Sequence, residues 1–140
     1  MFQFIKKLFG GKREPEHLRR GRLGEEAAKR HLKSVRLKFL VANFKTKDSE
    51  IDLVFRDDDC LIFVEVKART EGGWTRPAAA VDQRKRSLLS KAAREYVRQL
   101  CDPNVKFRFD IVEVLLVDGE VNEVRHIPNA FPLTKAKRHA

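Results

Sequence analysis

The chain has few of the residues that cross-link a protein or carry it through a membrane. Its 140 residues include two cysteines, Cys60 and Cys101. Neither stands in a metal-binding spacing such as Cys-x-x-Cys, so both are expected to be reduced thiols, which is typical of a cytoplasmic protein. No apolar run approaches the roughly 20 residues needed to cross a bilayer. The short apolar stretch at the start is interrupted by charge, and we do not expect a secretory signal.

Negative charges are fewer than positive ones, and the excess of positive charge is unevenly distributed along the chain. Lysine and arginine number 30 against 20 aspartate and glutamate, and eight of the ten excess positive charges lie in residues 1–50. Such an excess favours a polyanionic partner or an anionic membrane surface. The length suits one domain with a real core. We expect a tail at residues 1–17, the domain at 18–132 and a basic tail at 133–140.

Two apolar runs around an acidic turn predict a β-hairpin. Residues 50–56 and 61–67 flank the acidic residues 57–60, so an antiparallel pair is expected. A two-residue turn and a four-residue loop would share the same centre. In either case Asp52 lies opposite Glu65.

The charges of this hairpin are predicted to share one face. Glu50 would lie opposite Lys67, on the same side as Asp52 and Glu65, because side chains alternate along a strand. Two opposed carboxylates repel unless one is protonated or a cation lies between them. A divalent ion and the Lys67 ammonium would resolve the conflict. The other face would carry Ile51, Leu53, Phe55, Ile62, Val64 and Val66.

A surface ion-pair ladder on a solvated strand is the less favoured alternative. The run 61–67 is apolar on both faces at its start, as in a central strand, and buried charges there need partners.

These residues resemble the signature of a nuclease superfamily. Asp52, twelve further residues and then Glu65-Val66-Lys67 are similar to the D…(D/E)-x-K pattern of restriction-endonuclease-like nucleases, especially archaeal-type Holliday junction resolvases. A longer ordered set, covering about residues 18–132, resembles the bacterial YraN family (UPF0102). It comprises Gly24-Glu25-Glu26-Ala27-Ala28, Asn43, Glu50-Ile51-Asp52-Leu53, Phe63-Val64-Glu65-Val66-Lys67, Pro77 to Val81, Lys85, Arg108-Phe109-Asp110 and His126 to Phe131. The chain departs from that pattern at Ser49, where glycine is usual, and at Ala68, where threonine is common.

The resemblance implies an α/β, restriction-endonuclease-like fold with a central mixed β-sheet flanked by α-helices, in the order α-β-β-β-α-β-β. It also implies a Mg²⁺- or Mn²⁺-dependent endonuclease acting on DNA, which could be branched or otherwise structured. Asp52, Glu65 and the main-chain carbonyl of Val66 would hold the metal, with Glu25 bound through water. Lys67 would position the attacking water or stabilise the phosphorus. A resolvase would further be a homodimer with two active sites.

The first of two expected helices, about residues 18–35, brings Glu25 onto its apolar stripe. There Glu25 could join the metal site or simply benefit from the helix macrodipole. On the residues alone neither is preferred, and the resemblance favours the site. The apolar stripe consists of Leu23, Ala27, Ala28, Leu32 and Val35.

The second helix is expected from an Asp82 N-cap to about Leu100, with Leu88, Leu89, Ala92, Tyr96 and Leu100 toward the core. Its other side carries Arg84, Ser87, Lys91, Arg94 and Arg98 in steps of three or four residues. This stripe is either solvated surface or a phosphate contact, with Lys85 and Arg86 near the helix start. The sequence leaves both open.

The remaining segments give weaker signals. Arg69 and Trp74 belong to a stretch that could reach over a groove, where Trp74 would stack on a base or, more commonly, anchor its own loop. Residues 1–17 form a tail or, less favoured, a helix that contacts a membrane surface or a partner. Residues 105–117 and 120–126 read as a hairpin closed by Asp118-Gly119, with Asp110 and His126 in architectural roles.

Two other interpretations of the function stay open. One is a catalytically silent DNA-binding or accessory protein that keeps the nuclease fold. The other is a scaffold recruited by the Phe-rich amino terminus. The intact Asp52, Glu65 and Lys67 argue against the first, because a binding module gains little from acids in a phosphate groove. The sequence does not distinguish DNA from RNA, since lysine and arginine contact the phosphates of both.

Overall fold

A computed structural model describes residues 13–70, 81–102 and 104–135. In these residues the elements follow the order α2 (Glu16–Ser34), β1 (Lys38–Lys45), β2 (Glu50–Asp57), β3 (Cys60–Thr70), α3 (Gln83–Gln99), β4 (Lys106–Val117) and β5 (Glu120–Phe131). The expected α/β class and element order are confirmed. Trp74 and residues 1–12 of the expected N-terminal tail lie outside the described residues. The last two residues of that tail, 16 and 17, form the start of α2. No helix in the described residues is long and apolar enough to cross a membrane.

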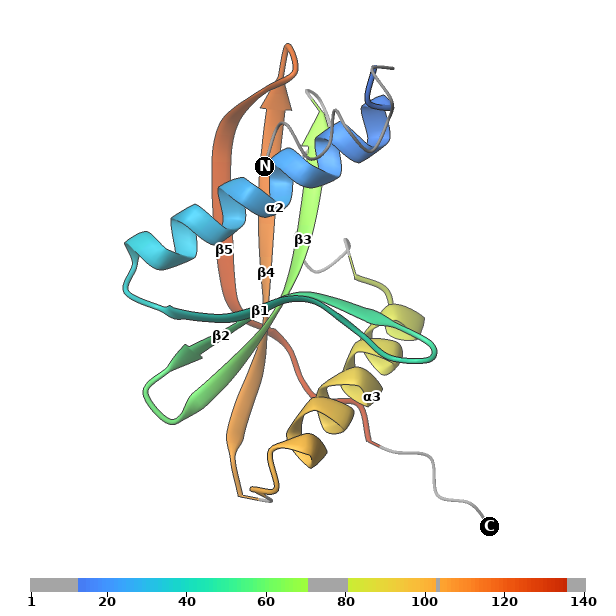
Figure 1. Cartoon of the computed structure of the whole chain (residues 1–140), viewed down its shortest axis with the longest axis vertical. Coiled ribbons are helices and arrows are strands. Elements are labelled where there is room, and N and C mark those ends of the chain that lie inside the picture. The colour runs from blue at the N-terminus through green and yellow to red at the C-terminus, as the bar shows by residue number, and fades with distance from the viewer. Residues whose placement is uncertain (1–12, 71–80, 103, 136–140) are drawn as a thin grey trace.

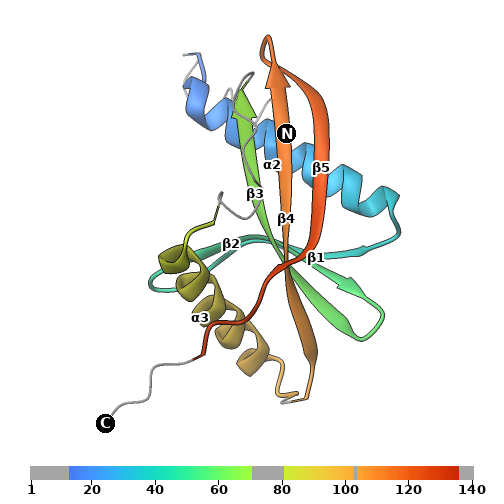
Figure 2. The same ribbon diagram turned by 180° about the vertical axis from the view of Figure 1, so that it is seen from behind.

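The five strands form one mixed sheet in the order β1-β2-β3-β4-β5, with β3 at its centre. The first three strands are antiparallel neighbours, β4 runs parallel to β3, and β5 returns antiparallel to β4. Figures 1 and 2 show β3, β4 and β5 side by side, with the β1–β2 hairpin running across them. The central position of β3 explains why its first half is apolar on both faces.

Both predicted tight turns are confirmed. Asp57 pairs with Cys60, which leaves Asp58 and Asp59 in the turn. Asp118 and Gly119, with φ of 52° and 76°, close β4 onto β5, as the left-handed turns of two-residue hairpins require. The last strand extends past the predicted end at residue 126, because Phe131 still pairs with Phe109 of β4.

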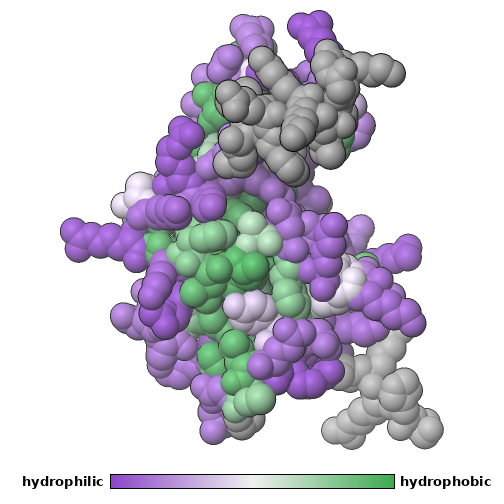
Figure 3. All heavy atoms as spheres, in the orientation of Figure 1, coloured by the Kyte–Doolittle hydropathy of each residue, from purple (hydrophilic) through white to green (hydrophobic). Residues whose placement is uncertain are grey.

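The two helices cover opposite sides of the twisted sheet and form separate cores. On the α2 side, Ala28 and Leu32 pack in one cluster with Phe55, Ile62 and Val64. On the α3 side, the cluster contains Leu89, Ala92, Val54, Phe63 and Phe109. Figure 3 shows that apolar side chains reach the surface in the middle and lower part of one face, bordered by hydrophilic residues.

Two residues expected in these cores are exposed instead. Val35 and Leu100 have relative exposures of 48% and 45%. Each is the C-cap residue of its helix, so the chain leaves the apolar stripe at that point. The periodicity was correct within both helices but does not reveal where a helix ends.

The first two strands change face at Asn43, which corrects one prediction. Ile51 was expected beside Leu53, but it belongs to the α3-side core while Leu53 belongs to the α2-side core. Their partners in β1, Phe44 and Ala42, divide in the same way. Between those partners Asn43 has φ of 55°, and a left-handed residue breaks the alternation of a strand. The end of the β1–β2 hairpin therefore turns its apolar side chains toward α3.

Candidate active site

Asp52 and Glu65 lie next to each other where the β2–β3 ladder ends. The predicted register is confirmed, since Leu53 pairs with Val64, and the ladder recorded between these strands stops before the two acids. Beyond that point Asp52 Oδ2 accepts a hydrogen bond of 2.8 Å from the Val66 main-chain N–H. Glu65 is only 5% exposed. Such burial is incompatible with the alternative of a solvated ion-pair ladder.

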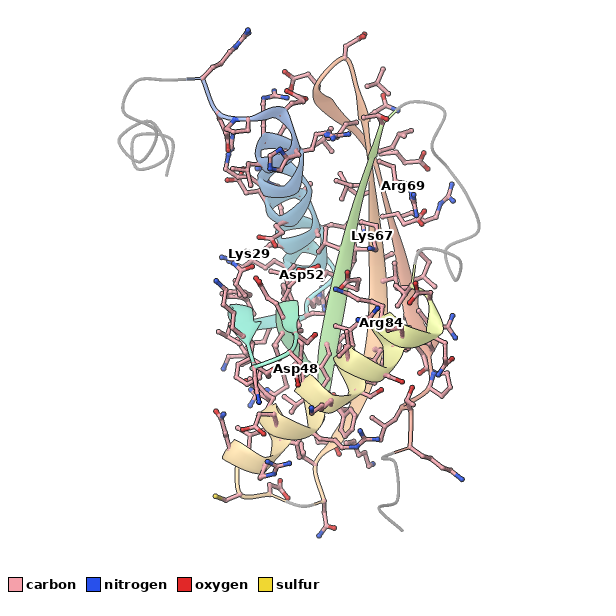
Figure 4. The ribbon with its side chains drawn as sticks, turned by 90° about the vertical axis from the view of Figure 1, so that its right-hand side faces the viewer. Lys29, Asp48, Asp52, Lys67, Arg69 and Arg84 are labelled. Atoms are coloured by element: carbon pink, nitrogen blue, oxygen red, sulfur yellow. The ribbon has the colours of Figure 1, made fainter. Side chains whose placement is uncertain are left out.

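Two lysines from different elements approach the same oxygen of Glu65. Lys67 Nζ lies 3.6 Å and Lys85 Nζ 3.8 Å from Glu65 Oε1. Lys85 belongs to the first turn of α3, where its main-chain N–H donates to Asp82 Oδ1 at 2.8 Å. Glu65 Oε2 is buried and accepts no hydrogen bond from the described residues. Figure 4 shows Asp52 and Lys67 beside β3, between α2 and α3.

Burial and mutual repulsion oppose ionisation of this acid pair. Burial, and next the charge of Asp52, raise the pKa of Glu65 from 4.5 to about 7, although Lys85 and Lys67 act in the opposite direction. Burial likewise raises the pKa of Asp52 against the effect of the hydrogen bond from Val66. The pair is therefore short of positive charge even with two lysines nearby.

The first helix brings Glu25 to the same group of acids. A Cβ atom added to Gly24 would lie 3.0 Å from Ala68 Cβ, so α2 packs closely on β3 at this point. With the Asn43 amide nitrogen turned toward the acids, Nδ2 donates to Glu50 Oε1 at 2.7 Å and to Glu25 Oε1 at 3.2 Å. Burial, followed by the charges of Asp52 and Glu50, raises the pKa of Glu25 to about 7.

The predicted pairing of Glu50 with Lys67 does not form. Glu50 pairs with Lys45 of β1, and its side chain shares the Asn43 amide with Glu25. The cause is the separation of β2 from β3 beyond Leu53, which the assumption of a continuous ladder did not include. Asn43 was the available signal, because asparagine adopts left-handed φ more readily than most residues.

The donor chemistry of this site fits a hard divalent cation. Asp52 and Glu65 offer carboxylate oxygens, and the Val66 carbonyl is a further oxygen at the same place in β3. The unpartnered Glu65 Oε2 and the raised pKa values of both acids fit a site that takes up positive charge. Among the described residues, no three His, Cys, Asp or Glu side chains form a ready-made metal cluster. Mg²⁺ commonly binds through one or two carboxylates and completes its shell with water and substrate oxygens.

The family of the chain follows from sequence comparison. The profile of the uncharacterised protein family UPF0102 matches residues 24–114, a range that contains every acid and lysine of the site. The chain belongs to this family. The resemblance to UPF0102 deduced from the ordered set of motifs is thus confirmed.

Relatives in this family match most of the chain. A UPF0102 protein of Porphyromonas gingivalis is 41% identical over 119 residues, which cover 84% of this chain and 87% of the relative. A UPF0102 protein of Geobacter metallireducens is 38% identical over 113 residues, with coverages of 81% and 92%. For a UPF0102 protein of Koribacter versatilis the values are 42% over 123 residues, 86% and 85%.

One departure from the expected family pattern has a simple explanation in this UPF0102 protein. Ser49 stands where the resemblance leads us to expect glycine, and the described residues with positive φ do not include it. The main chain therefore does not need glycine there.

Arg69 pairs with a second buried acid that the sequence analysis did not single out. Arg69 Nε lies 3.8 Å from Glu113 Oε1, and Arg125 Nη1 lies 4.0 Å from Glu113 Oε2. Glu113 is fully buried beside Lys67 in the β3–β4 ladder, and neither of its oxygens accepts a hydrogen bond from the described residues. The only signal in the sequence was one acid within the otherwise apolar run of residues 111–117.

The cations predicted to line α3 are present as a stripe, and most have partners in the protein. Lys91 Nζ lies 2.8 Å from Asp48 Oδ2, and Arg98 Nη1 lies 2.8 Å from Glu95 Oε2. Arg94 donates to the main-chain carbonyl of Thr134. Arg84 is exposed at the end of α3 that lies toward Lys67 (Figure 4).

Asp110 has the architectural position expected for it. It accepts hydrogen bonds from Arg108 Nε at 3.0 Å and from the Asn129 main-chain N–H at 2.9 Å, and His126 Nε2 lies 2.7 Å away. Burial alone would raise the pKa of Asp110, but the hydrogen bonds from His126 and Arg108 lower it overall. These contacts join β4 to β5 and account for His126 without a catalytic role.

Proposed function

We propose that this UPF0102 protein is a divalent-metal-dependent endonuclease that hydrolyses phosphodiester bonds in DNA. The observation that carries the proposal is the buried pair Asp52 and Glu65, with Lys67 and Lys85 at one Glu65 oxygen and no hydrogen bond to the other from the described residues. Without a bound cation, buried acids with raised pKa values lower the stability of the folded protein, and their negative charge repels phosphate. A purely structural role gives no reason for them, whereas strongly perturbed acids are common in active sites.

Each side chain has a definite task under this proposal. Asp52 and Glu65, with the Val66 carbonyl, would hold Mg²⁺ or Mn²⁺. When bound, the ion would supply positive charge to the phosphate and acidify water. Lys67 would orient the attacking water or donate to a phosphate oxygen as negative charge develops there. Lys85 approaches the site from α3 and would contact the same phosphate.

Glu25 would act at the edge of the site. Its pKa of about 7 allows it to accept and return a proton near neutral pH, where general acid–base catalysis is most effective. Asn43 donates hydrogen bonds to Glu25 and Glu50 and would keep the Glu25 carboxyl group in place.

The decisive experiment is a cleavage assay with matched substitutions. Linear duplex, single-stranded, flap and four-way-junction DNA would be incubated with the protein in Mg²⁺ or Mn²⁺. Asp52→Asn and Lys67→Ala should each lower cleavage by about 100-fold or more while DNA binding persists. Asp59→Asn and Lys106→Ala are the controls, because they remove the same groups from an exposed ion pair of 3.6 Å. Both should cleave like the wild type.

The outcomes separate the enzyme from its main alternative. Cleavage that both site variants lose supports the proposal, and the preferred substrate identifies the DNA structure. No cleavage of any substrate, with salt-sensitive binding retained, would refute it in favour of an accessory DNA-binding protein. A metal titration gives an independent measure, since Asp52→Asn should weaken Mg²⁺ or Mn²⁺ binding. Specificity for branched DNA would further require a twofold dimer, which equilibrium sedimentation can detect.

A further inference from the structure

A basic groove lies along α3 beyond the acid pair. Its volume is about 870 Å³, and it is formed by the β1–β2 turn (residues 45–48), one side of α3 (residues 87–99) and residues 134–135. Six of its lining side chains are cations and two are carboxylates. The cations are Lys45, Lys47, Lys91, Arg94, Arg98 and Lys135, and the carboxylates are Asp48 and Glu95.

The walls of the groove are held to α3 by specific contacts. On one side, Lys91 Nζ lies 2.8 Å from Asp48 Oδ2 of the β1–β2 turn. On the other, the Thr134 main-chain N–H donates to the buried Ser90 Oγ at 2.9 Å, and Arg94 donates to the Thr134 carbonyl. Three separate segments of the chain therefore build the groove, which distinguishes it from a solvated stripe on one helix.

The groove begins close to the acid pair. Lys85 contacts Glu65, and Leu88, three residues later and therefore its neighbour on the surface of α3, lines the groove. Figure 4 shows Asp48 beside α3 and Arg84 at the end of the helix nearer Lys67. At 1.5 Å per residue, the distance along the helix from Lys85 to Arg98 is about 20 Å.

We infer that this groove binds the sugar–phosphate backbone of the nucleic-acid strand that reaches the acid pair, an inference that rests on the proposed nuclease function. A strand of B-form DNA has one phosphate per 3.4 Å of axis, so about 20 Å corresponds to about six nucleotides. Leu88 is the one large apolar side chain among the described lining residues. Contacts in the groove therefore go to phosphates rather than to bases, and binding is independent of sequence. An acidic protein surface could also pair with the cations of the groove. The continuity of the groove with the acid pair favours nucleic acid instead.

The test is DNA binding by the full chain in EDTA, measured with a fluorescein-labelled oligonucleotide at several salt concentrations. The double variant Lys45→Ala/Lys47→Ala removes two groove cations and leaves α3 and the acid pair unchanged. Arg30→Ala/Lys38→Ala removes the same charge from exposed positions outside the groove. The groove variant should bind more weakly, and the slope of log K against log salt should fall by about 1 to 2, as expected for two lost phosphate contacts. The control variant should keep the wild-type slope.

Any of three results would overturn the inference. Equal losses in both variants would mean that net charge alone drives binding, and unchanged binding of the groove variant would place the strand elsewhere. A groove variant that loses binding to polyglutamate but not to DNA would likewise assign the groove to an acidic protein. Because binding is measured without metal, a failure of the cleavage assay leaves a positive groove result intact. If the wild type cleaves DNA but the groove variant binds DNA as tightly as the wild type, the result refutes the groove inference and leaves the proposed nuclease function intact.

Discussion

Replacing Glu65 with glutamine should stabilise the protein at alkaline pH while removing the proposed activity. Burial and the charge of Asp52 raise the pKa of Glu65 from 4.5 to about 7 in the folded state. An acid with a raised pKa binds its proton more tightly when folded, so the free energy of unfolding rises as pH falls from about 7 toward 4.5. Above pH 7 the full penalty for the ionised carboxylate is present. Glutamine has a similar shape without the charge and removes that penalty.

The size of the effect follows from the difference in pKa. At about 1.4 kcal/mol per pKa unit, a rise from 4.5 to about 7 corresponds to about 3 kcal/mol. For a chain of this length, that free energy changes the unfolding temperature by about 10 °C. At pH 5 the wild-type carboxyl group is mostly protonated, and the two proteins should unfold at nearly the same temperature. Saturating Mg²⁺ should stabilise the wild type more than Glu65→Gln.

Thermal unfolding followed by circular dichroism in EDTA at pH 5 and pH 8.5 measures this effect. Glu123→Gln, a change at an exposed position of β5, is the control and should show no such gain at pH 8.5. A Glu65→Gln protein that is less stable than the wild type at pH 8.5 would refute the reasoning. It would show that Lys67 and Lys85 stabilise the ionised carboxylate more than burial and Asp52 destabilise it.

Three further substitutions test the surroundings of the site. Gly24→Ala should lower the free energy of unfolding by about 1–2 kcal/mol, although alanine favours helices, because its Cβ would lie 3.0 Å from Ala68 Cβ. Urea unfolding should show recovery when Ala68→Gly is added, and a more stable single variant would contradict the contact. Asp110→Asn should cost about 3 kcal/mol at pH 7 by urea unfolding, since it removes a buried anion from Arg108 and His126. The pKa of Asp110 is lowered on folding, so this stabilisation is present above its ordinary value of 3.8 and is lost in more acidic solution; an equal cost at pH 3 would count against it. Arg69→Ala should cost about 2–3 kcal/mol, because it leaves buried Glu113 with fewer cations, and weaker DNA binding at unchanged stability would instead assign Arg69 to the nucleic acid.

Local signals were sufficient to predict the hairpins and the acid pair. The turn at residues 58–59 sets the register, so the position of Asp52 beside Glu65 needed no information from distant parts of the chain. The turn at residues 118–119 is equally local, because Asp-Gly is the preferred sequence for that geometry. The two helices followed from the spacing of their apolar residues.

Features that depend on how the helices pack could not be predicted in this way. Lys85 lies at Glu65 because α3 begins beside β3, whereas its sequence position indicated only a phosphate contact. Lys45 and Lys47 were not recognised, since they become part of a groove only when the β1–β2 turn meets α3. Glu50 does not face Lys67 as predicted, because the left-handed residue Asn43 changes the direction of the paired β1 and β2 strands.

The parallel pairing of β4 with β3 has a consequence for the order in which the protein acquires its site. The β2–β3 hairpin closes through two residues, and local hairpins form within microseconds. β4 can join β3 only after the whole intervening segment, including α3, has been made, and non-local pairing of this kind is slow. Asp52 and Glu65 therefore meet first in an open, hydrated hairpin, and most of their burial comes later. Under the proposed function, the ion would have its easiest access to the two acids at that stage, before the remaining strands and α3 enclose them.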